Sequence, residues 1–281
     1  MPHGSATTIG TTSPLGDRVS RVFHFSSRAL ATVVWLSCGL FGLYILIFYA
    51  GSLVSGHAAR WNNVLPGLYS DARPTSMAGI GMHFAAGGTI LALGFVQLLG
   101  TVRQRIPALH HWFGRIYVTA ALCAGAGGLI FIADTGTLGG LVMNTGFGLY
   151  GVLTMLAAVQ TYRYARRRQI DTHRMWAIRL FALAIGSWLY RMEYGLWFLV
   201  THKLGHTSDF HGPFDAVMAF FFYVPNLLIA EAYLRGSSER TGTAGRLTMA
   251  SLMIIAAGLL GVATYFFATQ YWWPMVARTI A

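Results

Sequence analysis

The sequence predicts an all-α integral membrane protein, a bundle of seven transmembrane helices with the N-terminus in the cytoplasm and the C-terminus outside. Hydrophobic residues make up 55% of the 281 residues and only 10% are charged, whereas soluble domains carry about a quarter charged residues. A bilayer core requires about 20 apolar residues as a helix. Seven stretches reach that length, namely 29–53, 77–100, 111–134, 138–162, 176–200, 214–235 and 247–270.

The distribution of basic residues predicts the orientation. If the N-terminus lies inside, fifteen Arg residues fall in cytoplasmic segments and only four basic residues fall in external ones. Short cytoplasmic loops of membrane proteins carry an excess of Lys and Arg, so this bias favours an internal N-terminus. The four external residues are Arg60, Arg73, Lys203 and Arg278.

The chain divides into three segments. We expect residues 1–28 to form a disordered cytoplasmic tail, because its first part is rich in Ser, Thr and Gly and lacks the pattern of a signal peptide. Residues 29–270 would form the seven-helix membrane domain. Residues 271–281 would form an outer segment that begins with Tyr271, Trp272 and Trp273, because consecutive aromatic residues are typical anchors at headgroup level.

The net charge of +11 and the pI of about 10.1 bound the expected partners. Because the basic residues lie in short loops between apolar runs, we expect anionic lipid headgroups as partners and not nucleic acid. The motifs of soluble enzymes, such as Gly-x-Ser-x-Gly or His-Glu-x-x-His, do not occur in the sequence. We also expect no metal site, because loop histidines such as His202, His206 and His211 are usually solvated.

A first set of polar residues lies where the third and fifth stretches begin on the cytoplasmic side. Ionisable groups in membrane helices are costly, so each is a candidate for a functional site. Gly114 stands four residues after His110 and leaves that helix face open to a bulky partner. The alternative is an interfacial belt, in which these side chains reach the lipid headgroups. The candidates are His110, His111, Arg115, His173, Arg174 and Arg179.

A second set lies deeper, in the outer half of the predicted bundle. His83 stands about 9 Å and Arg191 about 13 Å inside their helix ends, at a rise of about 1.5 Å per residue. A guanidinium at that depth requires a partner. The residues within reach are Glu193, Asp215, Asp134 and Asn144, and we favour Asp215, because a short loop joins the fifth and sixth stretches. The cluster is either a structural lock or a site for a ligand or proton. Its members are His83, Asn144, Arg191, Glu193 and Asp215.

Many of these residues belong to a longer pattern. It consists of His83…Gly94…Gln97, Leu109-His110-x-Trp112-x-Gly114-Arg115-x-Tyr117, His173-Arg174-Met175-Trp176-x-x-Arg179, and Arg191. With it the chain resembles a bacterial membrane-protein family, domain of unknown function 2306, over about residues 77–200. The chain departs from the family pattern at His111, where Arg is usual, and at Met175-Trp176, where the order is usually reversed. The resemblance implies a multi-pass protein of the bacterial inner membrane and no established function.

The histidines also show a distant similarity to cytochrome b561-like haem proteins. That resemblance implies a haem b held by two axial imidazoles, one from His110 or His111 and one from His173. Arg115, Arg174 and Arg179 would then bind the haem propionates. A second haem on the outer side is not expected, because only Met143 and Asn144 stand opposite His83.

Three functions therefore remain open, and the sequence does not decide whether the protein is an enzyme. The first is a redox or electron-transfer protein with one b-type haem. The second is a small transporter or proton-coupled permease that uses His83, Arg191 and Glu193 in the outer half and Glu231 in the inner half. The third is an accessory or assembly subunit without catalysis, in contact with another membrane protein or with a second copy of this chain.

Overall fold

The computed structural model describes residues 14–98, 100–236 and 242–280. The described part is 85% helical and contains no strand, which confirms the all-α prediction. Two short helices are π-helical (η1 and η3) and one is a 3-10 helix (η2). The elements in order are α1 Pro14–Ile45, η1 Leu46–Ala50, α2 Gly51–Val54, η2 Ala58–Asn63, α3 Pro74–Leu98, α4 Gly100–Arg105, α5 Pro107–Asp134, α6 Gly140–Arg166, α7 Ile170–Ala184, α8 Gly186–Thr201, α9 Pro213–Phe221, α10 Val224–Gly236, α11 Thr243–Phe267, η3 Ala268–Trp272 and α12 Trp273–Ile280.

Six segments of the described chain are long and apolar enough to cross a membrane, judged by length and composition. They coincide with six of the seven predicted stretches. The remaining stretch, 176–200, falls on α7 and α8, which have 15 and 16 residues. The count of seven spans and the orientation stay predictions. The six segments are Gly16–Val54, Pro74–Gly94, Pro107–Asp134, Gly140–Arg166, Pro213–Glu231 and Thr243–Ile280.

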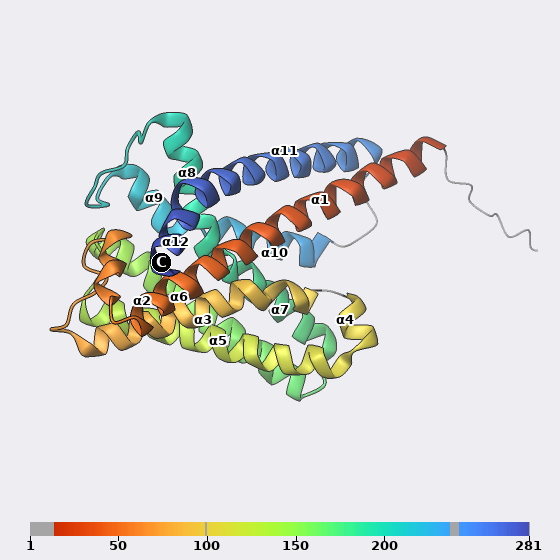
Figure 1. Cartoon of the computed structure of the whole chain (residues 1–281). Coiled ribbons are helices and arrows are strands. Elements are labelled where there is room, and N and C mark those ends of the chain that lie inside the picture. Colours follow the sequence, from red (N-terminus) through yellow and green to blue (C-terminus); the bar gives the residue numbers. More distant parts are fainter. Residues whose placement is uncertain (1–13, 99, 237–241, 281) are drawn as a thin grey trace, which may run out of the picture.

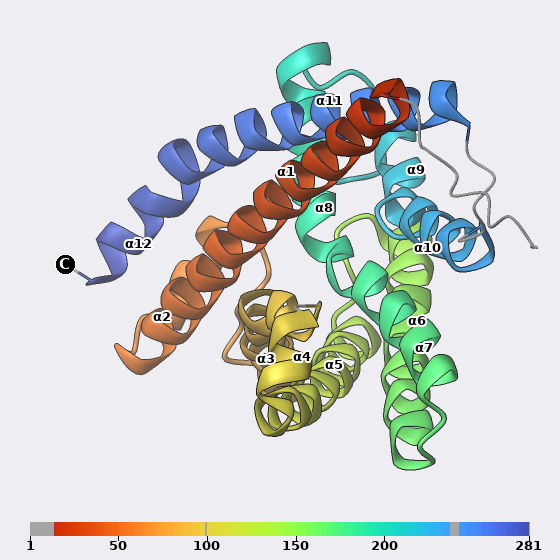
Figure 2. The ribbon, with the colours of Figure 1, turned by 90° about the vertical axis from the view of Figure 1, so that its right-hand side faces the viewer.

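Helices α3, α5, α6 and α7 form a bundle of neighbouring helices (Figure 2). Glycines bring the backbones of α3 and α5 together. A Cβ atom at Gly79 would lie 2.9 Å from the carbonyl oxygen of Gly127, and one at Gly127 would in turn meet the carbonyl oxygen of Gly79. Such close approach through small residues is typical of membrane helices. These glycines therefore pack the bundle tightly.

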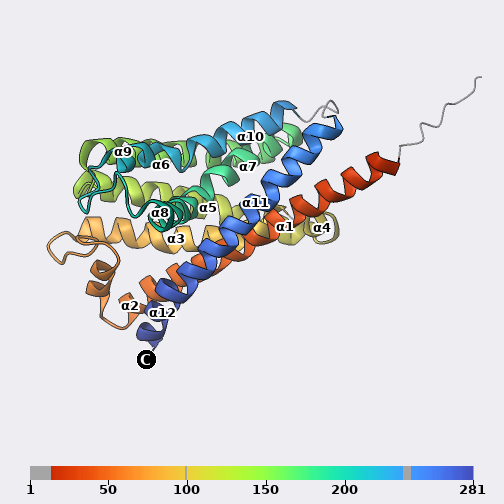
Figure 3. The ribbon, with the colours of Figure 1, turned by 90° about the horizontal axis from the view of Figure 1, so that it is seen from above.

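Helices α1 and α11 pack against each other and run obliquely to this bundle (Figures 1 and 3). The first helix begins at Pro14, so half of the predicted tail is helical; residues 1–13 lie outside the described residues. The last helical run continues past residue 270 through η3 and α12. Trp272 is 6% exposed, with its ring centroid 5.3 Å from that of Phe41. It packs inside the protein, whereas Tyr271 and Trp273 keep the exposure expected of an anchor.

Two of the helical runs are interrupted. α7 ends at Ala184 and α8 continues in a different direction, away from the bundle and toward α11 (Figure 2). The hydroxyl of Tyr150 donates to the carbonyl oxygen of Leu183 at this break, at 2.9 Å. The second break, between α9 and α10, precedes Pro225, where the sequence suggests a kink. Asn226 donates from Nδ2 to the carbonyl oxygen of Phe222 there, at 2.9 Å, so side chains satisfy both interrupted backbones.

Candidate functional site

The departure of α8 from the bundle leaves a cavity of about 840 Å³ in the half of the protein that the sequence predicts to be the outer one. α3, α5 and α6 line one side of it, and α8, η1 and η3 line another. The loop formed by residues 64–68 contributes to its wall, and the exposed residues His202 and Lys203 line its rim. Most of the lining side chains are apolar or aromatic. A cavity of this size with a few polar groups is typical of a binding site for a small molecule.

Glycines keep part of the cavity wall free of side chains. Gly87, Gly125, Gly128 and Gly151 line the cavity from α3, α5 and α6. A Cβ atom added at Gly87 would meet no heavy atom within 4 Å, so this glycine borders open space. The space therefore depends on small residues on one side and on the tilt of α8 on the other.

His83 lies in the wall on α3, and its two ring nitrogens have different surroundings. Nδ1 is 2.8 Å from the carbonyl oxygen of Ala124 on α5. A carbonyl oxygen only accepts hydrogen bonds, so Nδ1 carries the proton and Nε2 of the neutral ring is an acceptor. A Cβ atom at Gly128 would lie 3.2 Å from Nδ1 and 3.6 Å from Cε1. The ring thus turns its Nδ1 edge to α5, and Nε2 is free to accept a proton or hydrogen bond from a ligand.

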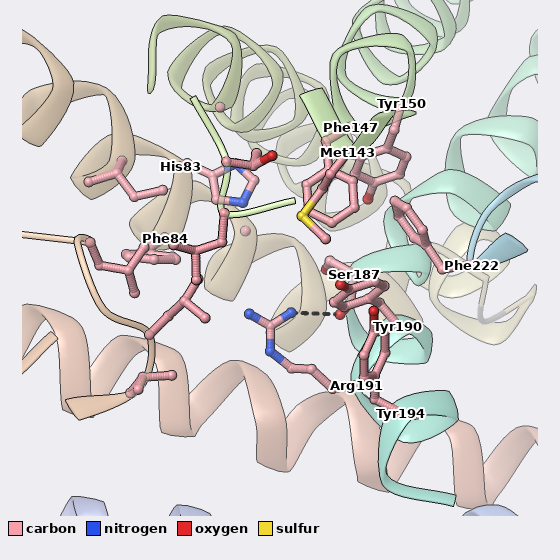
Figure 4. A pocket seen from close by; sticks show the side chains of 18 of the residues that line it. His83, Phe84, Met143, Phe147, Tyr150, Ser187, Tyr190, Arg191, Tyr194 and Phe222 are labelled. Carbon is pink, nitrogen blue, oxygen red and sulfur yellow. Dashed lines mark hydrogen bonds between the residues drawn. The ribbon is translucent and has the colours of Figure 1, made fainter. Parts of the chain in front are cut away.

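Arg191 reaches into the same cavity from α8 (Figure 4). Its Nη1 donates to the carbonyl oxygen of Ser187, at 2.9 Å. Its Cζ lies 4.9 Å from the ring centroid of Phe41 on α1. Among the described residues, Arg191 has no ion pair with a carboxylate. A guanidinium has five N–H donors, so most of its hydrogen-bonding capacity remains available.

The charged side chains that line the cavity are cationic. Arg191 and Lys203 line it, together with His83 and His202, and within the described part of the chain its lining contains no Asp or Glu. Cations in a largely apolar environment interact strongly with an anion, because little water screens the charge. The cavity is therefore suited to a molecule with an apolar body and an anionic group.

The predicted pairing of Arg191 with Asp215 was wrong. Asp215 is 1% exposed and its carboxylate accepts hydrogen bonds from Tyr194 OH at 2.7 Å, His206 Nδ1 at 2.7 Å and two backbone amides at 3.1 Å each. Those amides belong to Thr207 and Gly212. The short loop between α8 and α9 folds back onto the carboxylate of Asp215. Donors from this loop therefore occupy the positions around the carboxylate that Arg191 was expected to take.

The other two residues of the outer set do not line the cavity. Asn144 accepts hydrogen bonds through Oδ1 from the amide and hydroxyl of Thr137, at 2.7 and 2.8 Å, and so fixes the turn between α5 and α6. Glu193 lies two residues after Arg191, and its Oε2 is buried without a hydrogen-bond partner. The structure therefore brings together His83 and Arg191, and separates them from Asn144, Glu193 and Asp215.

The six candidates at the start of the third and fifth stretches also do not form a single cluster. His111, Arg115 and Arg174 are exposed, whereas His110, His173 and Arg179 are partly buried. Arg115 lies over the ring of Trp112, with Cζ 5.3 Å from its centroid, as in an interfacial belt. Arg179 forms two hydrogen bonds with the carboxylate of Glu231, both at 3.0 Å. Its guanidinium is thus engaged by a protein carboxylate.

His173 has the orientation of a potential metal ligand. Its Nδ1 is 2.9 Å from the carbonyl oxygen of Thr161, which leaves Nε2 without the proton. Metal-bound histidines often make this second hydrogen bond. Nδ1 of His110, by contrast, is enclosed and has no partner. Within the described residues, no group of three or more His, Cys, Asp or Glu side chains could hold a metal ion.

Sequence reasoning missed the aromatic part of the cavity. Tyr190 and Tyr194 flank Arg191 on α8, and their ring centroids are 4.6 Å apart. Their spacing of four residues places them on one helix face, which is a signal that the sequence does contain. Tyr150 on α6 and Met143 near its start complete this wall (Figure 4).

Comparison with known proteins gives one match. The model of a family described as predicted membrane protein (DUF2306) matches residues 80–234, which include His83, Arg191 and Asp215. No curated protein and no solved structure matches the chain.

Proposed function

We propose that this chain, which belongs to the DUF2306 family of predicted membrane proteins, binds an amphiphilic weak acid in its outer cavity, as the first step of a small permease. The observation that carries this proposal is Arg191, a cation that has no carboxylate partner among the described residues and lies in a cavity whose described lining contains no acid. Arg191 is partly buried, and a cation withdrawn from water costs free energy unless it is paired, so an anionic ligand would supply the missing partner.

In this proposal, His83 accepts the proton of the acid. Its Nε2 is an acceptor, because Nδ1 donates to the carbonyl oxygen of Ala124. An acid that enters the cavity in its neutral form can give its O–H proton to Nε2, and the resulting anion can be held by Arg191. The apolar body of the ligand would contact the aromatic side chains of Tyr190, Tyr194 and Phe147. An open space around His83 and Arg191 supports a ligand site over a structural lock.

The proposal is tested with a dodecanoate analogue that carries a photoreactive diazirine on its chain. The protein is placed in nanodiscs of zwitterionic lipid, and cross-linked peptides are identified by mass spectrometry. We expect labelling of the cavity-lining parts of α3 and α8. Dodecanoate should compete about 10- to 100-fold better than dodecanol, since hydrogen bonds to a charged group contribute about 1.5–3 kcal/mol.

Two variants make this experiment specific. Arg191→Gln should lose the preference for dodecanoate over dodecanol. Arg174→Gln removes an exposed Arg from α7 and should keep that preference. Equal competition by the acid and the alcohol against the unaltered protein would refute the anion site, and so would an Arg191→Gln protein that still prefers the acid.

A second candidate function is electron transfer through a b-type haem on the inner side, which the orientation of His173 favours. His173 would hold the iron through Nε2, with His110 as the other ligand, and the haem would supply the one-electron chemistry. Arg179 is engaged by Glu231, so it does not fit the propionate role. A visible spectrum of the purified protein, oxidised and dithionite-reduced, tests this candidate. A Soret band that disappears in His173→Ala would support it, and a colourless protein would speak against it.

A further inference from the structure

The contact between α3 and α5 contains buried polar atoms without a hydrogen-bond partner. They are Nε2 of Gln97, Nδ1 of His110 and the hydroxyl oxygen of Tyr117. Almost all buried polar groups in proteins have a partner, and hydrocarbon offers none. Three such atoms in a single helix contact therefore indicate a function or bound water. All three belong to the motif residues that the proposed function does not use.

The packing of the two helices places these atoms in one line. Gly94 makes room for Tyr117, since a Cβ atom at Gly94 would lie 3.1 Å from Cε2 and 3.6 Å from the hydroxyl oxygen. Gly114 makes room for Gln97 in the same way, with Oε1 at 3.4 Å. His110, Gly114 and Tyr117 are four and three residues apart on α5 and share a face. Tyr117, Gln97 and His110 thus follow one another over about 10 Å.

The inner end of this line lies at the beginning of α5. His110 is the fourth residue of the helix that begins at Pro107. The charged and titratable groups that act on it are His111 beside it, His173 on α7 and Arg103 on α4. Arg103 and His111 are exposed. His110 therefore lies beside exposed residues at this end of the line.

The outer end of the line belongs to a buried cluster of side chains that borders the cavity. Tyr117 belongs to the same buried cluster as Tyr223, whose hydroxyl oxygen is also buried without a partner. Tyr150 packs against this cluster, with its ring centroid 5.5 Å from that of Tyr223. Tyr150 in turn lines the cavity that contains His83 and Arg191.

We propose that the α3–α5 contact is a proton route between the cavity and the inner ends of the helices. A hydroxyl or an imidazole accepts a proton on one side and donates one on the other. The amide of Gln97 would hold a water molecule between Tyr117 and His110. A proton released in the cavity would pass through Tyr150, Tyr223 and Tyr117 to His110, and only O–H and N–H bonds would form and break. The proposed function enters this inference only as the source of the proton.

The route is tested without any amphiphile, so that its failure and the failure of the ligand site are distinguishable. Vesicles containing the protein and a trapped pH-sensitive dye are exposed to a potassium diffusion potential set by valinomycin. We expect faster proton flux than in protein-free vesicles. Tyr117→Phe and Gln97→Leu should reduce the flux to the protein-free rate, because the first removes a hydroxyl that passes the proton on and the second removes the amide that holds the bridging water.

Matched controls exclude a general effect of losing a Tyr or a Gln. Tyr265→Phe on α11 and Gln104→Leu on α4 change exposed residues and should keep the flux of the unaltered protein. A protein that conducts no faster than lipid alone overturns the route, and so does undiminished flux in Tyr117→Phe.

Hydroxyl-radical labelling of the unaltered protein gives a second measurement that does not depend on a variant's folding. Tyr117 is 6% exposed and Tyr44 is 7% exposed, but Tyr44 OH has a partner, the sulfur of Met275, at 3.3 Å. Water in the route would make Tyr117 react faster than Tyr44. Equal protection of the two tyrosines would show that the contact is dry and would overturn the proposal.

Discussion

Gly186, the first residue of α8, lies against Phe222 in the break between α9 and α10. A Cβ atom at Gly186 would be 3.3 Å from Cδ2 of Phe222 and 3.4 Å from its carbonyl oxygen. The two interrupted helices therefore meet at their breaks. Ser187 and Phe222 both line the cavity, so this contact fixes where α8 leaves the bundle and, with it, the position of Arg191.

Gly186→Val should destabilise the protein, because the added methyl groups would meet Phe222 and, from the other side, Tyr150 at 3.3 Å. Overpacking of this kind costs about 1–3 kcal/mol. The melting temperature followed by tryptophan fluorescence is the measurement. Gly258→Val on α11 is the control, since a Cβ atom there would meet nothing within 4 Å. Equal melting temperatures for the two variants would contradict the close contact.

Asp215→Asn should destabilise the protein by about 2–4 kcal/mol, because an amide cannot accept from all four donors that surround this carboxylate. The exposed Asp209 provides the control, and Asp209→Asn should change stability by less than about 0.5 kcal/mol.

Because Arg191 and Asp215 do not pair, the effects of Arg191→Gln and Asp215→Asn on stability should add. If the double variant were more stable than Arg191→Gln alone, this would indicate an Arg191–Asp215 ion pair and contradict the structure.

The Arg179–Glu231 pair joins α7 to α10 by two hydrogen bonds of 3.0 Å. Arg179→Ala should lower the free energy of unfolding by about 2–4 kcal/mol, because it leaves a partly buried carboxylate without its cation. The double variant Arg179→Ala, Glu231→Ala should recover part of that loss. Chemical unfolding in detergent measures both effects. If the two single changes simply add, the pair has no coupling energy.

The path of α7 and α8 decides the topology. Fusions of a reporter after Arg168 and after Ala281 should lie inside and outside, respectively, if this interrupted helix crosses the membrane. Between the two points there are then three crossings, whereas without α7 and α8 there are two. Activity of both fusions on the same side would show that the interrupted helix does not cross, and would reduce the bundle to six spans.

Much of the fold was predictable because apolar length is a local property. The six long segments match predicted stretches, since about 20 apolar residues in a row have few alternatives to a membrane helix. The fifth stretch was harder, because Arg179, Arg191 and Glu193 lower its apolar character and the helix breaks at Ile185. α7 contains no Pro or Gly that would have predicted this break, and the nearest glycine is Gly186, after the break.

The depth of the candidate residues along their helices could be predicted from the sequence, but their hydrogen-bond partners could not. Counting residues placed His83 and Arg191 at similar depth, and they do line one cavity. Counting could not show that the loop residues His206, Thr207 and Gly212 surround Asp215. The rise per residue gives a position along a helix axis, which the sequence by itself determines. The rotation of each helix, the tilt of α8 and the folding back of the loop depend on packing between distant segments, so only the tertiary structure decided that Arg191 faces a cavity without a carboxylate.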